Sequence, residues 1–132
     1  MKNNKAKVLI IDDEEEIGIL LISVLGSIGF KAEHKLSLHS GLSAFELNNY
    51  DIVFLDLRLP DGEGISIIPR IREKNADANI IMISAHGGQQ DIERAFGMGV
   101  NSYLQKPFNM EQIKSALKGS PDNPKAGATT MH

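Results

Sequence analysis

The sequence predicts an α/β domain built on a doubly wound, five-stranded parallel sheet. Three observations predict this fold: short, almost continuously apolar runs recur along the chain, segments with helical spacing lie between them, and the connections are short. Such runs, rich in β-branched residues, are typical of parallel strands covered on both faces. The 132 residues, 42% of them hydrophobic, are enough for one domain with a sizeable core and too few for a two-domain enzyme.

The expected elements alternate along the chain. Segment 31–36 alternates apolar and polar residues, as an edge strand would, and the other four strands are the apolar runs 8–11, 52–55, 80–83 and 100–104. The first helix is expected over 17–28, where apolar residues recur every three or four positions. The later helices are expected over 39–47, 64–74, 89–97 and 110–118.

The C-terminal residues differ in composition from the rest of the chain. From Gly119 onward they include two prolines and two glycines and show no apolar period. We therefore expect residues 1–118 to form the domain and 119–132 to be a flexible tail or linker.

Composition and charge exclude several classes of function. A formal net charge of -3 and a pI near 5.8 provide no basic excess, so direct nucleic-acid binding is disfavoured. The chain has no cysteine, which excludes disulfides, thiolate nucleophiles and cysteine-ligated zinc or iron–sulfur sites. The polar N-terminus does not resemble a signal peptide, and the longest apolar-rich segment, 17–30, falls short of the ~20 residues of a membrane span. We expect a soluble, cytoplasmic protein without membrane contact.

Polar side chains follow the apolar runs where each run ends. Asp12 and Asp13 follow the first run, Asp56 and Ser84 follow the two central runs, and Lys106 lies just beyond the last. Because ligands in open α/β sheets bind beyond the carboxyl ends of the strands, these groups are expected to converge on one rim. Three carboxylates and one ammonium sum to -2, a charge that a hard divalent cation, Mg²⁺ above all, would neutralise. Such a site can accept a phosphoryl group.

Each of these groups also has a simpler explanation. Asp12, Asp13 and the glutamates at 14–16 could be a helix N-cap and an acidic first turn, favoured by the helix dipole. Ser84 or Lys106 taken alone is an ordinary strand-end residue. Asp56 is harder to explain, because a carboxylate closing a buried run is costly to desolvate without a partner. Their joint occurrence at successive strand ends favours a functional site.

Four motifs in order resemble the receiver domain of bacterial two-component response regulators: VLIIDDEEE, DIVFLDLRLPDGEG, IIMISAHG and YLQKPF. The resemblance covers about residues 6–118, and LPDGEG and MISAHG are similar to receivers of enhancer-binding transcription activators. It implies a (βα)5 flavodoxin-like fold with strand order 2-1-3-4-5. It also implies that an aspartate accepts a phosphoryl group from a sensor histidine kinase or a histidine phosphotransfer protein. The domain would then change conformation and signal to an output domain or partner, and phosphorylation could lead to a homodimer.

The resemblance also implies roles for individual residues. Asp56 would be the phosphoacceptor. Asp13 and Asp56 would bind Mg²⁺, or Mn²⁺, directly, Asp12 would act mainly through a coordinated water, and the backbone carbonyl of Arg58 would be a further ligand. The domain would catalyse only its own phosphorylation and dephosphorylation.

Further implied roles concern the phosphoryl group and the switch. Ser84 would donate a hydrogen bond to a phosphoryl oxygen, and Lys106 would pair first with the acceptor and then with the phosphoryl group. Ala85 would leave space beside the phosphate. Tyr103 would take the aromatic switch position, although an aromatic on a strand is often simply half-buried. The Lys106–Pro107 bond resembles the family's cis peptide.

Three other functions can be compared with the residues present. A dehalogenase-type phosphatase would have an Asp-x-Asp motif, and Arg58 stands where its second aspartate would be. A nucleotide-binding loop would need more than Gly62 and Gly64, whose PDGEG segment indicates a turn. A pure interaction module whose acidic rim binds a cation structurally stays open.

Helical geometry gives one further expectation. At about 100° per residue, with Ile17 as the origin, Ile19 and Ile22 fall near 200° and 140° on the face away from the core. We expect both to be exposed beside the acidic rim, where they could anchor the kinase. The expected core face is centred near 10°, and comprises Leu20, Leu21, Val24, Leu25 and Ile28.

Overall fold

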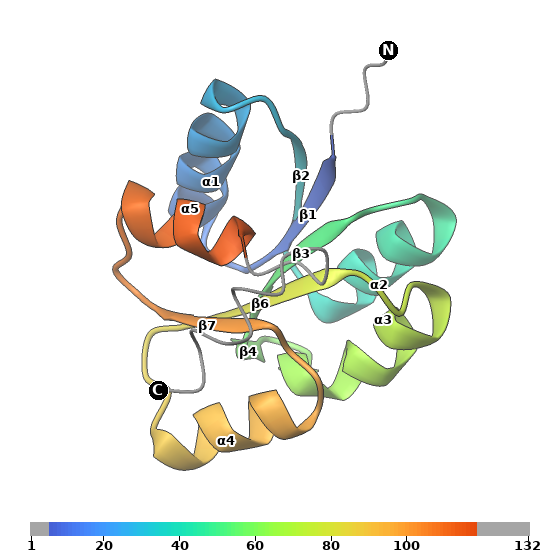
Figure 1. Cartoon of the computed structure of the whole chain (residues 1–132). Coiled ribbons are helices and arrows are strands. Elements are labelled where there is room, and N and C mark those ends of the chain that lie inside the picture. Colours follow the sequence, from blue (N-terminus) through green and yellow to red (C-terminus); the bar gives the residue numbers. More distant parts are fainter. Residues whose placement is uncertain (1–5, 119–132) are drawn as a thin grey trace.

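The computed structural model describes residues 6–118 as a parallel sheet with helices on both faces (Figure 1). The expected tail at 119–132 lies outside these residues. The sheet has the order β2-β1-β3-β6-β7, and every neighbouring pair is parallel. Its strands are β1 (Lys7–Ile11), β2 (Lys31–Lys35), β3 (Ile52–Asp56), β6 (Asn79–Ser84) and β7 (Ser102–Gln105). Counted within this sheet alone the order is 2-1-3-4-5, which confirms the expected fold.

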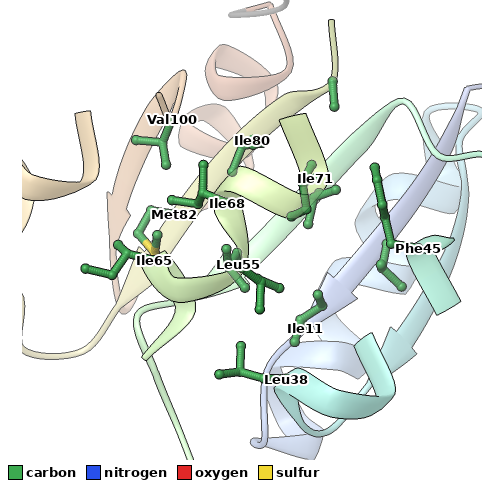
Figure 2. Close-up of a cluster of buried hydrophobic side chains, with 14 of the residues drawn as sticks. Ile11, Leu38, Phe45, Leu55, Ile65, Ile68, Ile71, Ile80, Met82 and Val100 are labelled. Atoms are coloured by element: carbon green, nitrogen blue, oxygen red, sulfur yellow. The ribbon is translucent and has the colours of Figure 1, made fainter. Parts of the chain in front are cut away.

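Five α-helices cover the two faces. They are α1 (Glu15–Ser27), α2 (Leu38–Leu47), α3 (Ile68–Lys74), α4 (Gln89–Gly97) and α5 (Met110–Leu117). Alternate side chains of each strand point to opposite faces, so Leu9 and Ile11 join one core cluster while Val8 and Ile10 join the other. The first cluster lies under α2, α3 and α4 and is drawn in Figure 2. The second cluster lies under α1 and α5, the two helices that Figure 1 shows side by side on one face of the sheet. Among the described residues, no helix is long and apolar enough to cross a membrane.

Two short elements after β3 were not expected from the sequence. β4 (Arg58–Leu59) and β5 (Gly62–Glu63) pair antiparallel around the predicted turn, where Gly62 has a positive φ of 147°. A 3-10 turn, η1 (Gly64–Ile67), then precedes α3, which carries a proline in its first turn. Proline fits there because the N–H that it lacks would have no partner inside the helix. The expected helix over 64–74 therefore begins as a 3-10 turn.

The last strand begins two residues later than expected. The Val100 amide donates to the Ala95 carbonyl at the end of α4, so this buried residue closes the helix and does not join the sheet. The Asn101 amide then reaches the Ile80 carbonyl at 2.8 Å, and regular pairing with β6 begins at Ser102.

The phase of α1 is partly as predicted. Ile19 is 68% exposed and Ile22 is also exposed, which confirms the expectation for both. The prediction was wrong for Leu20, which is 40% exposed, and for Ile28, which follows the helix end at Ser27.

Gly18 explains the shift in phase. It is buried, and a Cβ placed on it would lie 2.0 Å from Nδ1 of His34 on β2. The helix turns this small residue toward the edge strand, so its buried face is Gly18, Leu21, Val24 and Leu25. That face is centred about 30° from the predicted one, which leaves Leu20 outside it.

Candidate functional site

The predicted site residues converge at the carboxyl ends of the strands. Asp12 and Asp13 follow β1, Asp56 and Ser84 end β3 and β6, and Lys106 follows β7. A pocket of about 260 Å³ opens among them. Its lining is Asp13, Glu14, Asp56, Arg58, Ser84, Ala85, His86 and Lys106.

The three aspartates form a compact oxygen cluster. One carboxylate oxygen from each of Asp12, Asp13 and Asp56 lies within 4.8 Å of the others. Asp12 and Asp56 are buried, whereas Asp13 is exposed. Three hard oxygen donors that can face one point fit a divalent cation of the Mg²⁺ type.

Asp12 is fixed at both of its oxygens. Its Oδ1 accepts the amide of Glu14 at 2.7 Å. Its buried Oδ2 forms an ion pair with Nζ of Lys106 at 2.8 Å. A buried carboxylate oxygen would be costly without a cation beside it.

Lys106 lies between three carboxylates. Its Nζ is 2.7 Å from Oε1 of Glu14 and 3.4 Å from Oδ2 of Asp56, besides its contact with Asp12. Burial alone would lower the pKa of this ammonium, but the surrounding carboxylates outweigh burial and raise it. Lys106 is therefore held as a cation. Its amide donates to the Ser84 carbonyl at 2.8 Å, and the bond to Pro107 is cis, as the family pattern implied.

Asp56 is the most perturbed acid of the site. Burial, and secondly the charge of Asp12, raise its pKa to about 6, although Lys106 and the Arg58 amide act in the opposite direction. The Arg58 amide lies 3.4 Å from Oδ1 of Asp56. At neutral pH this carboxylate is ionised, but the nearby positive charge and hydrogen bonds do not fully offset its burial and the charge of Asp12. A cation or an electrophile placed beside it would therefore be stabilised.

This perturbation predicts how stability depends on pH. The pKa of Asp56 is about 6 in the folded domain and near 3.8 in the unfolded chain, so the unfolded state loses this proton first. Without Mg²⁺, ionisation should cost about 2 kcal/mol of folding stability as pH rises from 4 to 6, and the cost should level off above about pH 7. Urea unfolding at pH 4 and pH 6 should show that the free energy of unfolding of Asp56→Asn increases relative to that of the parent as pH rises. A pH-independent difference would contradict the burial of a charged Asp56.

Ser84 and its neighbours form the opposite wall of the pocket. The buried Oγ of Ser84 accepts the amide of His86 at 3.1 Å, which leaves its proton free for another acceptor. The guanidinium of Arg58 turns away toward α4 and β5, where it pairs with Asp91 at 3.4 Å and Glu63 at 3.7 Å.

Tyr103 lies on β7 with its ring half-buried against the core cluster under α2, α3 and α4. Its buried hydroxyl has no hydrogen-bond partner among the described residues. A Cβ on Gly87 would lie 1.5 Å from this hydroxyl, so only glycine leaves room for the ring in this position. The simpler expectation of packing is therefore observed, and the switch role stays a prediction.

Two residues of the site were not identified from the sequence. The sequence pattern places Glu14 in an acidic helical turn, but its side chain binds Lys106, 92 residues away. His34 was expected only as part of an edge strand, and its Nε2 lies 2.7 Å from the backbone oxygen of Asp12. The adjacency of Glu14 to Asp12 and Asp13 was the one available signal.

Comparisons with known proteins agree with this geometry. The model of the response regulator receiver domain matches residues 8–118. The transcriptional regulatory protein RprY of Bacteroides fragilis is 32% identical over 111 residues, which are 84% of this chain and 47% of that protein. The chain spans about half the length of the curated relatives it matches.

Solved structures resemble this chain in fold and, to a moderate degree, in sequence. A two-component response regulator from Clostridium difficile superposes with a TM-score of 0.81 at 27% identity, covering 86% of this chain and 93% of that one. The beryllofluoride-activated NtrC4 receiver domain dimer superposes with a TM-score of 0.82 at 27% identity, covering 89% of this chain and 98% of that one. The family match spans nearly all of the described residues, and the chain therefore belongs to the response regulator receiver domain family.

Proposed function

We propose that this receiver domain accepts a phosphoryl group on Asp56 in a Mg²⁺-dependent reaction. The donor would be the phosphohistidine of a sensor histidine kinase or of a histidine phosphotransfer protein. The observation that carries the proposal is the position of Asp56 at the pocket. One of its oxygens lies within 4.8 Å of an oxygen of each of two other carboxylates, and its Oδ2 is 3.4 Å from the Lys106 ammonium. Receiver domains are signalling domains and not metabolic enzymes.

The residues present suit the metal. Asp13 and Asp56 would bind Mg²⁺ or Mn²⁺ directly, Asp12 would act through a coordinated water, and the Arg58 carbonyl would add a further oxygen. The bound cation supplies positive charge that neutralises the carboxylates and the phosphoryl oxygens in the transition state.

The protein's own groups then carry the transfer. An oxygen of Asp56 attacks phosphorus, the bond from phosphorus to the histidine nitrogen breaks, and that nitrogen keeps the electron pair. Lys106 and the free Ser84 proton would donate hydrogen bonds to phosphoryl oxygens as the P–O bond forms. With no other substrate, the domain would catalyse only its own phosphorylation and hydrolysis.

The output of the signal is also part of the proposal. Ser84 and Tyr103 would act as the switch, and residues 119–132 would connect the domain, proposed to span 1–118, to an output domain or partner. Transcription regulation is supported by the curated relatives, which are transcriptional regulatory proteins. The motifs LPDGEG and MISAHG favour receivers of enhancer-binding activators, and the dimeric NtrC4 receiver supports homodimer formation on phosphorylation. The proposed location is the cytoplasm.

The test is incubation with acetyl phosphate and Mg²⁺ followed by intact-mass measurement. We expect one acid-labile phosphoryl adduct that forms only with the metal present. Turnover of added phosphoesters would favour a phosphatase instead, and the absence of any adduct would favour a structural cation site.

A separate prediction concerns the kinase. Ile19 and Ile22 expose apolar surface on α1, which begins directly after the acidic rim. Such residues could anchor the helices that carry the phosphohistidine. The double substitution Ile19→Ser, Ile22→Ser should slow transfer from the cognate kinase about tenfold or more, with little change for acetyl phosphate or thermal stability. Leu47→Ser removes an even more exposed apolar side chain from the end of α2 and serves as control. Equal slowing by the control would contradict docking through α1.

A further inference from the structure

The side chain of Glu14 makes the shortest contact of the Lys106 ammonium. Oε1 of Glu14 lies 2.7 Å from Nζ, compared with 3.4 Å for the nearer oxygen of Asp56. In the domain without a phosphoryl group, Lys106 is therefore bound more closely by Glu14 than by the acceptor that it is proposed to serve.

Helix capping does not account for this contact. Glu14 is the N-cap residue of α1, yet its side chain makes no capping hydrogen bond. The backbone amide of Glu14 itself donates a hydrogen bond to Oδ1 of Asp12. The carboxylate of Glu14 has turned toward the pocket, which it lines together with Asp56 and Lys106.

The two closest partners of Lys106 differ in how easily they can release it. Asp12 is fully buried and fixed by the Glu14 amide, so leaving its carboxylate without a cation would be costly. The Glu14 side chain is 56% exposed, so water can replace the ammonium at its carboxylate. The Lys106 side chain is only 9% exposed and has three protons to donate. A phosphoryl oxygen needs one of these protons, and Glu14 is the partner that can give one up.

We propose that Glu14 is a positioning residue that holds Lys106 in the unphosphorylated domain and yields it to the phosphoryl group on Asp56. This inference rests on the proposed roles of Asp56 and Lys106. Breaking the contact with Glu14 is then part of the barrier to phosphorylation. A variant without this contact should be phosphorylated faster, because its lysine is already free to bind the incoming oxygens.

Three variants separate contact from charge. Glu14→Gln keeps the length of the side chain and loses the charge. Glu14→Asp keeps the charge, but its carboxylate is withdrawn by about 1.5 Å, out of contact with Nζ. Glu15→Gln removes the same charge from the next residue, which is exposed and forms no ion pair with any described residue.

The rate of phosphorylation by acetyl phosphate is measured at several donor concentrations with saturating Mg²⁺. We expect Glu14→Gln and Glu14→Asp to raise the maximal rate about twofold to fivefold, the size of one partly exposed charged contact, and Glu15→Gln to leave it unchanged. If Glu14→Gln and Glu15→Gln both react faster while Glu14→Asp does not, the rate depends only on the negative charge near the pocket, and the proposal is overturned. Parental or slower rates in both Glu14 variants would also overturn it.

A second readout needs neither metal nor phosphoryl donor. The ¹⁵N-labelled ammonium of Lys106 should exchange its protons with water slowly in the parent and faster in both Glu14 variants, with Glu15→Gln like the parent. Unchanged exchange in the Glu14 variants would show that Glu14 does not hold the lysine. Failure of the parent to form any adduct would instead overturn the proposed function, and with it the role of this contact in phosphorylation.

Discussion

Replacing Asp56 with asparagine is expected to abolish phosphorylation by both acetyl phosphate and a phosphohistidine donor. The amide keeps the shape of the carboxylate but has no anionic oxygen to attack phosphorus, and it removes one negative charge from the acidic cluster that would bind the metal. Intact-mass spectrometry over the time course that fully labels the parent should detect no adduct.

The fold of this variant should be unaffected. Since the pKa of Asp56 is raised to about 6, loss of its buried charge should stabilise the domain at neutral pH without Mg²⁺. Asp13→Ala is the matched comparison, because Asp13 contributes to the same cluster but is exposed. That variant should bind Mg²⁺ more weakly in calorimetric titration and be labelled slowly, but still be labelled. Undiminished labelling of Asp56→Asn would rule out Asp56 as the acceptor.

Replacing Gly64 with alanine is expected to be the most damaging small substitution near the site. A Cβ at Gly64 would lie 2.1 Å from the backbone oxygen of Asp56 and 3.0 Å from the Leu55 side chain. Backbone cannot move aside as a flexible side chain can, and the Gly64 amide is itself tied to the Leu57 carbonyl at 2.7 Å. We expect a loss of about 2–4 kcal/mol in the free energy of unfolding, together with slower phosphorylation, because the acceptor strand must shift.

Gly26→Ala provides the control for this prediction. Gly26 lies in α1, where a Cβ would meet nothing within 4 Å. Alanine is favoured over glycine inside a helix, so this variant should gain up to about 1 kcal/mol and be phosphorylated like the parent. If Gly64→Ala had the stability and phosphorylation rate of the parent, the close contact between Gly64 and the backbone of Asp56 would be contradicted.

The positions of the acceptor and of its hydroxyl neighbour could be predicted because they depend on strands that the sequence marks clearly. Asp56 and Ser84 close two fully buried runs, and parallel pairing brings both strand ends to one rim. The order of the strands came from the motifs, since apolar periodicity does not specify which strands are neighbours.

Other features depend on contacts that no local pattern contains. The phase of α1 follows from the fit of Gly18 against His34, a contact between a helix and the next strand. The hydrogen bond between Glu14 and Lys106 joins two residues that are 92 positions apart in the sequence. Each strand of the β4–β5 hairpin is only two residues long, too short to show an alternating pattern.

The phosphoacceptor can be identified directly by locating the phosphoryl group chemically. Borohydride reduces an aspartyl phosphate to homoserine, and peptide mass spectrometry then identifies the modified residue. After treatment with acetyl phosphate and Mg²⁺, we expect homoserine at position 56 and at no other aspartate. Homoserine at Asp12 or Asp13, or none in a fully labelled sample, would contradict phosphorylation of Asp56.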